Sequence, residues 1–307
     1  MDPSISSIQP GGGFCMSLEL GWGRLRRAYL RRFRKGYLAR MAGKRLGSAG
    51  RYPHEMLDPR DLKFFRNQGD IRWQEEDDPF AWRNRLFFVR AGLAEIIVIG
   101  GGFLALGLAL LLLFWPLAPL PLLGACFTLW FFRNPARKIP TDAGLVVAPA
   151  DGRVFAVREV EHDDLLGGPA VVIDIFLSVF NVHINRVPMA SRVIGMTYRR
   201  GKFLSALRPE AAGENECLEV RWETTSLPRR VLRVRQITGA IARRIVCWVS
   251  PDERLPRGAQ FGMIKLGSRT ELTIPREPGL QLCTWEGQKV RAGVSVLARY
   301  PDERASG

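Results

Sequence analysis

Residues 262–272 read Gly-Met-Ile-Lys-Leu-Gly-Ser-Arg-Thr-Glu-Leu. Apolar residues precede the pair Gly267-Ser268, and a strand pattern resumes over residues 269–274. The stretch therefore predicts one β-strand that is pinched or bulged at the Gly-Ser pair. Such a pair is common in strands, and for the pair alone a bulge with a solvated serine is the simpler interpretation.

The sequence around this stretch has the same character from Gly144 onward, because short runs of Val, Ile and Leu are separated by turn residues. Regular short strands of this kind predict a mainly β fold, an all-β barrel or sandwich. The expected strands cover residues 145–147, 153–157, 170–177, 191–198, 217–222, 230–236, 244–249, 260–266, 270–274 and 294–299.

Residues 91–132 form a long apolar segment whose only charge is Glu95. Residues 96–115 are nearly long enough for the helix of about 20 residues that crosses a bilayer, and Pro116, Pro119 and Pro121 then interrupt the pattern. We expect a hydrophobic helical membrane anchor here, either a hairpin or a re-entrant segment. The alternative is a pair of buried helices in a soluble domain, which the apolar residues on all faces of 108–114 disfavour.

The chain is strongly basic, with a net charge of +15 and a pI near 10.4. Charge alone is compatible with nucleic acid or with an anionic membrane surface as the partner. Basic residues stand at both ends of the apolar segment, so the positive-inside tendency predicts that both ends, and the domain that follows, face the cytoplasm at the cell membrane. These residues are Arg83, Arg85 and Arg90 before the segment, and Arg133, Arg137 and Lys138 after it.

Residues 1–90 form a basic N-terminal extension. Arginines between Arg24 and Arg51 alternate with Leu, Tyr and Phe, which fits either a basic helix on lipid headgroups or a poorly ordered extension. No signal-peptide pattern follows the start. The five cysteines and three histidines are scattered, so we expect neither a disulfide framework nor a metal site. The chain thus divides into this extension, the anchor 91–132 and a β-rich domain 133–307.

Four segments in order resemble the short-form phosphatidylserine decarboxylases, over roughly residues 131–275. The first three are Phe131-Phe132-Arg133-Asn134-Pro135-Ala136-Arg137, Pro149-Ala150-Asp151-Gly152 and Val182-His183-Ile184-Asn185-Arg186-Val187-Pro188. The fourth is the opening stretch with Phe261 before it, which is similar to the site where members of that family cut themselves before the serine of Leu-Gly-Ser or Phe-Gly-Ser.

The resemblance implies that the chain is cleaved between Gly267 and Ser268 and that Ser268 becomes a covalent pyruvoyl group, the enzyme's cofactor. Glycine before the serine can adopt a strained backbone that lets the hydroxyl approach the Gly267 carbonyl. The ketone would form a Schiff base with the substrate amine and accept electrons as CO2 leaves. The expected reaction is decarboxylation of phosphatidylserine to phosphatidylethanolamine in phospholipid biosynthesis. The expected partners are phosphatidylserine in the membrane and the chain's own segment 268–307.

Two further catalytic residues are implied by the resemblance. His183 would transfer protons near neutral pH, and Asp151 would orient or polarise a base. Longer members of the family carry a second histidine where this chain has Arg186, so it stays open which group serves cleavage and which serves decarboxylation.

Cationic side chains are expected to bind the lipid phosphate or the substrate carboxylate, because such groups pair well with oxyanions. The candidates are Arg186, Lys202, Arg243, Arg244 and Arg269. The resemblance also covers Glu214-Asn215-Glu216, for which a solvated acidic loop is the simpler interpretation.

Three alternatives stay open. A related decarboxylase could act on another serine lipid, such as archaetidylserine, because the apolar segment does not distinguish acyl from isoprenoid chains. A membrane-tethered β-barrel binding module without catalysis would need no chain break at Gly267-Ser268. A nucleic-acid binder would not need the apolar segment, so we expect no nucleic-acid partner. The oligomeric state is not determined by the sequence.

Overall fold

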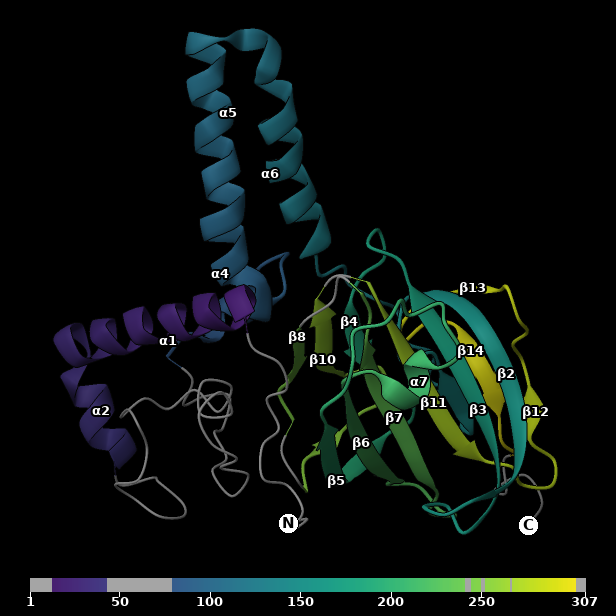
Figure 1. The fold of residues 1–307 in the computed structure, drawn as a ribbon. Helices are drawn as coiled ribbons and strands as arrows, with labels where there is room; N and C mark the ends of the chain where they lie inside the picture. The colour runs from purple at the N-terminus through teal and green to yellow at the C-terminus, as the bar shows by residue number, and fades with distance from the viewer. Residues whose placement is uncertain (1–12, 43–78, 241–243, 250–251, 266, 302–307) are drawn as a thin grey trace.

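The computed structural model describes residues 13–42, 79–240, 244–249, 252–265 and 267–301. This part of the chain forms three regions, which are two N-terminal helices, a helical hairpin and a β-rich domain (Figure 1). Arg243 and Leu266 lie outside the described residues.

The hairpin begins with helical turns that run without a break from Arg90 to Leu113. These are η3 (Arg90–Gly92), α4 (Leu93–Glu95), the π-helical η4 (Ile96–Gly100) and α5 (Gly101–Leu113). Phe114 leaves the helical conformation, with φ −158° and ψ 76°. The short η5 (Trp115–Leu117) then leads into α6 (Pro119–Phe131), whose first residue is a proline, a residue well suited to a helix start.

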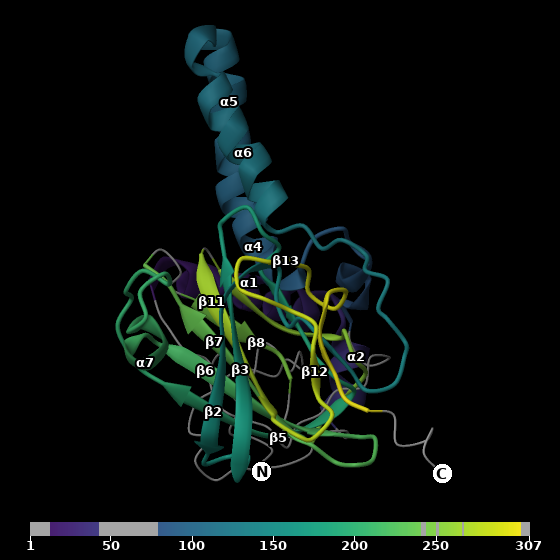
Figure 2. The ribbon, with the colours of Figure 1, turned by 90° about the vertical axis from the view of Figure 1, so that its right-hand side faces the viewer.

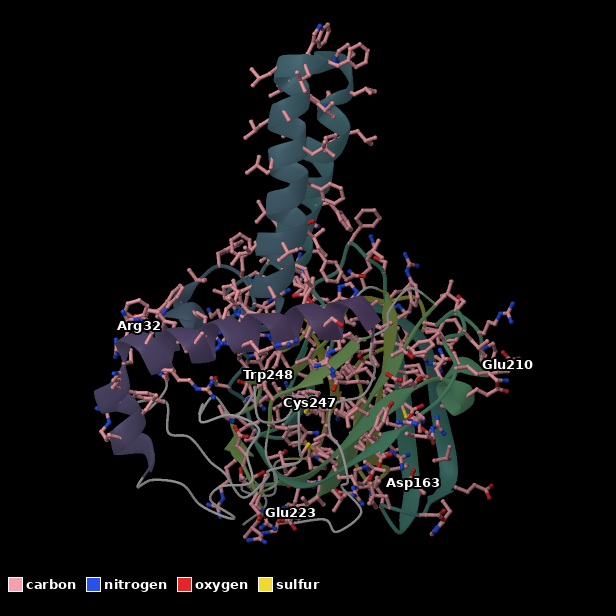
Figure 3. The ribbon with its side chains drawn as sticks, turned by 60° about the vertical axis from the view of Figure 1, so that its left-hand side comes forward. Arg32, Asp163, Glu210, Glu223, Cys247 and Trp248 are labelled. Atoms are coloured by element: carbon pink, nitrogen blue, oxygen red, sulfur yellow. The ribbon has the colours of Figure 1, made fainter. Side chains whose placement is uncertain are left out.

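Helices α5 and α6 pack closely because glycines remove side chains from their interface. A Cβ at Gly107 would lie 2.5 Å from Leu122 Cδ2, and one at Gly124 would lie 3.1 Å from Phe103. The hairpin projects away from the β-rich domain as a narrow stalk (Figures 1 and 2). Its outward side chains are almost entirely carbon (Figure 3), and Leu112 and Leu113 near the tip are 88% and 83% exposed. An 18-residue window within residues 90–113 has a mean hydropathy of 2.7, and this helical run is long and apolar enough to cross a membrane.

The N-terminal helices are α1 (Gly13–Phe33) and α2 (Lys35–Ala42). Figure 1 shows α1 lying across the foot of the hairpin. Leu30 packs with Tyr37 and with Phe80, which precedes η2 (Ala81–Arg85). Arg32 lies at the end of α1 that is farther from the hairpin (Figure 3).

The β-rich domain contains three antiparallel sheets. The large sheet has the order β13 (Lys289–Val290), β2 (Gly152–Asp163), β3 (Gly168–Leu177), β11 (Ser268–Pro275), β7 (Val231–Thr238), β6 (Cys217–Thr224), β5 (Ser191–Arg199), β9 (Arg254–Leu255). The second sheet contains β1 (Leu145–Val147), β14 (Val296–Arg299) and β12 (Gln281–Leu282). The third contains β4 (Ile184–Arg186), β10 (Gln260–Lys265) and β8 (Arg244–Cys247), and a short α7 (Ala211–Glu214) precedes β6.

One hydrophobic core joins all three sheets, with Val146 from the second sheet, Ile264 from the third, and Trp222 and Leu272 from the large one. The prediction of a mainly β domain is confirmed, and each predicted strand overlaps an observed one. Within the described residues the large sheet ends at β13 and β9 without a pairing between them, so it is not a closed barrel.

The stretch 262–272 differs from its prediction. It is not one bulged strand, because β10 lies in the third sheet and β11 lies in the middle of the large one. Gly267 makes the change of direction with φ 63°, a left-handed conformation that glycine adopts at little cost. The solvated-bulge interpretation is also wrong, since Ser268 is 0% exposed.

Candidate active site

Ser268 is the first residue of β11 and is held on both sides by strand pairing. It lies opposite Leu177 of β3 and Thr238 of β7. Its hydroxyl oxygen is buried and has no hydrogen-bond partner among the described residues. Leaving a buried hydroxyl unpaired costs about 1–3 kcal/mol, so such groups are uncommon outside sites where they are used.

His183 contacts the residue that precedes this serine. Its Nε2 accepts a hydrogen bond from the Gly267 N–H at 3.1 Å, and its Nδ1 lies 3.0 Å from the Asn181 carbonyl oxygen. A carbonyl oxygen only accepts, so the proton is assigned to Nδ1 and the imidazole is neutral. Phe131, at the end of α6, covers the ring with a centroid separation of 4.5 Å.

The environment keeps His183 neutral over the physiological range. Burial lowers the pKa of His183 from its ordinary value of 6.5 to about 4. The hydrogen bond with Asn181 raises the pKa, and the positive charge of Arg133 lowers it. Arg133 is fixed nearby by donating to the carbonyls of Phe180 at 2.9 Å and Trp130 at 2.6 Å. The imidazole is therefore neutral beside the Gly267-Ser268 bond, and its acceptor nitrogen is bonded to the Gly267 N–H.

The Gly267 carbonyl oxygen lies close to a second glycine, Gly239. A Cβ at Gly239 would lie only 2.6 Å from the Gly267 carbonyl oxygen, closer than real contacts allow. The backbone just before Gly239 is fixed by Asn215, which donates to the Thr238 carbonyl at 2.7 Å and is fully buried. Neither residue was assigned a role from the sequence, although Asn215 lies in the Glu214-Asn215-Glu216 segment.

Glu216, from the same segment, is also buried, so the solvated-loop interpretation fails for Asn215 and Glu216. The Glu216 carboxyl accepts a hydrogen bond from the Tyr198 hydroxyl at 3.1 Å. Burial raises the pKa of Glu216, while Tyr198 and the charge of Arg244 act in the opposite direction. The Glu216 backbone carbonyl accepts a hydrogen bond from the Thr238 hydroxyl at 3.0 Å. Thr238 in turn lies opposite Ser268 in the large sheet.

Asp151 lies at a junction between segments. One oxygen of its carboxylate binds Arg137 at 2.7 Å, and the other accepts from the Ala292 N–H at 2.7 Å. Within the described chain it makes no hydrogen bond with His183 or Ser268, so the structure does not bring the three predicted catalytic residues into one hydrogen-bonded chain. Its orienting role stays a prediction.

The predicted oxyanion-binding residues are dispersed. Lys202 is on the surface, where it pairs with Glu214 at 2.7 Å. Arg244 is buried in β8 and donates to the Ile245 carbonyl at 3.1 Å. Arg186 donates to the Gly258 carbonyl at 2.8 Å and lines a cavity. Arg243 lies outside the described residues.

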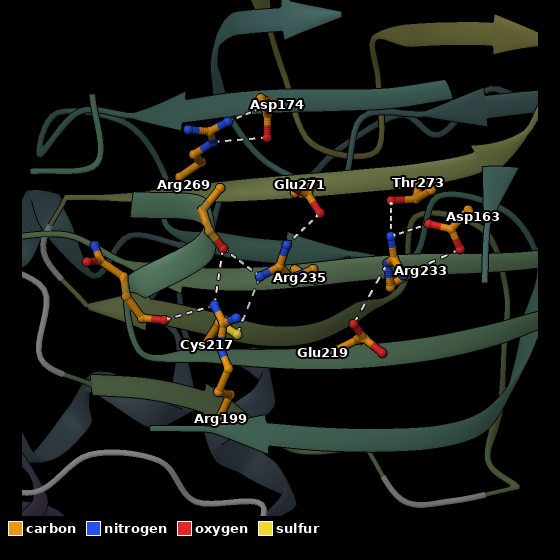
Figure 4. Close-up of polar contacts among 12 residues, drawn as sticks. Asp163, Asp174, Arg199, Cys217, Glu219, Arg233, Arg235, Arg269, Glu271 and Thr273 are labelled. Atoms are coloured by element: carbon orange, nitrogen blue, oxygen red, sulfur yellow. Dashed lines mark hydrogen bonds and ion pairs between the residues drawn. The ribbon is translucent and has the colours of Figure 1, made fainter. Parts of the chain in front are cut away.

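Arg269 belongs to the opposite face of β11 from Ser268, because successive side chains of a strand alternate. It is buried and forms an ion pair with Asp174, with Nε to Oδ1 at 2.9 Å. On the same face Glu271 binds Arg235 at 3.0 Å, and Arg233 is bonded to Asp163 (Figure 4). Arg269 is thus part of a charged network across the sheet, and its contact with substrate stays a prediction.

A buried ion pair connects the hairpin to the cleavage segment. Lys265, two residues before Gly267, pairs with Glu95 of α4 and donates to the Ala91 carbonyl at 3.0 Å. Both side chains lie at the end of an apolar cavity of about 780 Å³ along the hairpin, which also reaches Phe131. The sequence marked Glu95 as the lone charge of the apolar segment, yet it could not identify the partner.

Comparison with known proteins relates these features to a family. Residues 125–298 match the family described as phosphatidylserine decarboxylase. Proteins named phosphatidylserine decarboxylase proenzyme are similar to the chain. The one from Rhodopirellula baltica is 51% identical over 78% of this chain and 99% of its own length. Those from Syntrophus aciditrophicus and Symbiobacterium thermophilum are 42% and 43% identical, over 70% and 66% of this chain and 98% and 92% of their own lengths.

Proposed function

The chain belongs to the phosphatidylserine decarboxylase family, and we propose that its reaction, phosphatidylserine to phosphatidylethanolamine, depends on self-cleavage between Gly267 and Ser268. The observation that carries the proposal is the local geometry. Gly267 has a left-handed backbone, its N–H binds the neutral His183, and the adjacent Ser268 hydroxyl is buried without a hydrogen-bond partner in the described part of the chain.

Cleavage requires that the Ser268 oxygen attack the Gly267 carbonyl carbon. An ester bond forms, the C–N bond of the peptide breaks, and the hydroxyl proton passes to the new amine of Ser268. Loss of the Ser268 α-proton and cleavage of its Cβ–Oγ bond then leave a carboxylate at Gly267 and a dehydroalanine at 268. Hydrolysis of the latter by one water releases ammonia and leaves a pyruvoyl group. His183 is the proposed carrier of these protons, and its hydrogen bond with the Gly267 N–H supports this role.

The residues present fit such a group. A pyruvoyl at position 268 supplies a ketone that takes up the substrate amine and accepts the electron pair left behind by CO2. Around it, the chain provides a site without bulk water, since Ser268, Thr238 and His183 are all 0% exposed. The neutral imidazole can hold or deliver a proton, and a low pKa keeps it from adding a fixed positive charge.

The segment 268–307 is expected to stay associated after cleavage. Strand β11 is paired along its length with β3 and β7, and β14 pairs with β1 and β12. Asp151 adds a bond from the long segment to the Ala292 N–H of the short one. We infer that Asp151 supports the site through this junction.

We further propose that the hairpin inserts into the membrane from the cytoplasmic side. Its exposed apolar surface and the 24-residue helical run support insertion. Helix α1 supports a flat contact with the headgroup layer, because Leu25, Tyr29 and Phe33 recur every four residues and stay exposed, at 66%, 44% and 68%. Arginines on the same helix, such as Arg31 and Arg32, are exposed beside this stripe.

The test is release of labelled CO2 from phosphatidylserine by the purified full-length protein in neutral vesicles. The wild type should release CO2, and Ser268→Ala should release none. Ser226→Ala is the matched control, because Ser226 is exposed in the loop between β6 and β7, at the opposite end of β7 from Thr238 and Ser268, and it should behave as the wild type. Retained activity in Ser268→Ala would contradict the proposal.

A further inference from the structure

A second cavity lies at the foot of the hairpin, on the β4 and β10 side of the domain. Its volume is about 500 Å³, and its polar lining consists of Arg90, Arg186, Asn84, Asn134 and Gln260. Trp248 forms part of its wall, in the region marked in Figure 3. Among the described residues, the lining includes two arginines and no carboxylate. The cavity therefore has the composition of an anion site.

Both arginines are largely removed from solvent, each with 9% exposure. Burial lowers the pKa of Arg186, and the nearby charge of Arg137 lowers it further, whereas Asp151 raises it. Asp151 does not line the cavity, and its carboxylate is already bonded to Arg137 and to the Ala292 N–H. An anion in the cavity would offset the cost of burying the Arg186 guanidinium.

This cavity is distinct from the reaction centre. Asn185 donates to Thr270 at 3.0 Å, and Thr270 lies on the same face of β11 as Ser268. Arg186 follows Asn185 in β4, so its side chain leaves the opposite face of that strand. A ligand held by Arg186 is therefore on the other side of β4 from Thr270.

The position of the cavity indicates the source of the anion. Arg90 is the first residue of the helical run that is long enough to cross a membrane. Its guanidinium is therefore at the depth of lipid headgroups when the hairpin is inserted. Asn134 and Gln260, which are bonded to each other at 2.9 Å, add neutral hydrogen-bonding groups. Arginine pairs with phosphate through two parallel N–H donors, which suits a phosphodiester.

We propose that the Arg90–Arg186 cavity binds the headgroup phosphodiester of an anionic phospholipid that is not the reacting substrate, while its acyl chains stay beside the hairpin. The proposal rests on the membrane insertion proposed above. Such a lipid fixes the foot of the hairpin against β4 and β10.

The test measures binding of short-chain dioctanoyl phosphatidylglycerol to the full-length wild-type protein in a neutral detergent, by native mass spectrometry and by titration calorimetry. This lipid has no amine, so it does not enter the decarboxylation reaction. One molecule should bind to the wild type, and Arg90→Gln and Arg186→Gln should each weaken binding about tenfold or more. Arg254→Gln, which removes an exposed arginine of β9, is the matched control and should leave binding unchanged.

Further measurements compare other ligands with phosphatidylglycerol and use a variant that keeps both arginines. Dioctanoyl phosphatidylcholine, whose charge is balanced, should bind more weakly than phosphatidylglycerol. Inorganic phosphate that binds as tightly as the lipid would overturn the lipid as the occupant. Ala259→Leu fills the cavity and keeps both arginines, so it should also lose binding. Equal affinity in wild type, both arginine variants and Ala259→Leu would overturn the proposal.

The outcome is separable from that of the proposed function. The wild type could release CO2 and insert stably into neutral vesicles while phosphatidylglycerol binding is unaffected by substitution of Arg90 or Arg186. That result would contradict this inference alone. Absence of CO2 release or of insertion in the wild type would instead contradict the function proposed above.

Discussion

At the scale of single residues, both the N–H and the carbonyl oxygen of Gly267 are in close contact with other residues. Its N–H binds His183, its carbonyl oxygen lies against Gly239, and its φ of 63° directs the next residue into β11. In the proposed self-cleavage, the electrophile is therefore positioned by His183 and by the close contact with Gly239, and the nucleophile Ser268 is held by strand pairing. Precise placement of this kind can account for a large part of a rate enhancement.

The variant Gly239→Ala tests the contact between Gly239 and the Gly267 carbonyl oxygen. The new Cβ must push the Gly267 oxygen or the 238–240 backbone aside, at a cost of about 1–3 kcal/mol, which corresponds to about a 10- to 100-fold slower cleavage. The time course of chain cleavage after cell-free translation measures it. Gly168→Ala is the matched control, because a Cβ there meets nothing within 4 Å.

The Gly239→Ala effect should be confined to maturation. The fraction of the variant that does mature should keep the wild-type KM for phosphatidylserine, since after cleavage the Gly267 carbonyl is no longer an electrophile. A variant that cleaves at the wild-type rate, or one that matures normally and loses only substrate affinity, would contradict the positioning role.

The lowered pKa of His183 predicts how cleavage depends on pH. A free imidazole loses its proton-accepting ability as pH falls through 6.5, but burial moves the pKa of His183 to about 4. Cleavage of newly translated precursor should therefore persist at pH 5 and decline only near pH 4. The folded state binds this proton less readily than the unfolded chain, so stability should fall as pH drops from about 6.5 toward 4. A cleavage rate that halves near pH 6.5 would speak against a buried neutral imidazole.

At the scale of elements, Lys265 on β10 and Glu95 on α4 join the hairpin to the cleavage segment. Removing one partner of a buried pair leaves an uncompensated charge, so Glu95→Ala should destabilise the protein by about 3–5 kcal/mol. The double variant Glu95→Leu with Lys265→Met should be less destabilised than Glu95→Ala, because neither charge remains. Denaturant midpoints in neutral detergent measure this difference. A double variant that is destabilised at least as much as Glu95→Ala would show that the pair is not coupled.

Sequence patterns predicted the strands better than they predicted the connections between sheets. The motifs containing His183 and Ser268 were found from resemblance, and the structure brings His183 to Gly267. The split of residues 262–272 between two sheets depends on partners at distant positions, such as Val246 for Met263 and Ile173 for Leu272. Strands as short as β4, β9, β12 and β13 have too few residues to show a period.

The supporting residues of the site could not be found from local pattern for a related reason. Gly239 is required only because the Gly267 carbonyl approaches it across paired strands. Asn215 and Glu216 read as polar loop residues, and only the contacts with Thr238 and Tyr198 give them buried positions. Register and tertiary contact, rather than composition, determine these roles.

At the scale of the whole molecule, the hairpin and α1 lie together on the side that we propose faces the membrane. The hairpin projects from this side, and α1 crosses its foot (Figure 1). The apolar cavity along the hairpin ends at Lys265, Glu95 and Phe131, and Phe131 also covers His183. Phe131 therefore lies between the apolar cavity along the hairpin and His183.

Membrane insertion of the hairpin predicts the effect of charges on its outer surface. Leu106 and Leu112 are exposed on α5, and Leu106→Asp with Leu112→Asp should cost about 2.5–3.5 kcal/mol for each charge placed at the bilayer centre. The fraction of protein left in membranes after an alkaline carbonate wash should fall strongly. Leu207→Asp, at an exposed leucine of the β-rich domain, should leave that fraction unchanged. Full retention of the double variant would argue against insertion.

The most direct measurement is the intact mass of the purified wild-type protein beside Ser268→Ala. We predict two wild-type fragments, residues 1–267 and 268–307, with the short one lighter than a serine-initiated peptide by the mass of one ammonia molecule. Ser268→Ala should give one uncut chain. A single uncut chain in wild-type protein that decarboxylates phosphatidylserine would contradict the account.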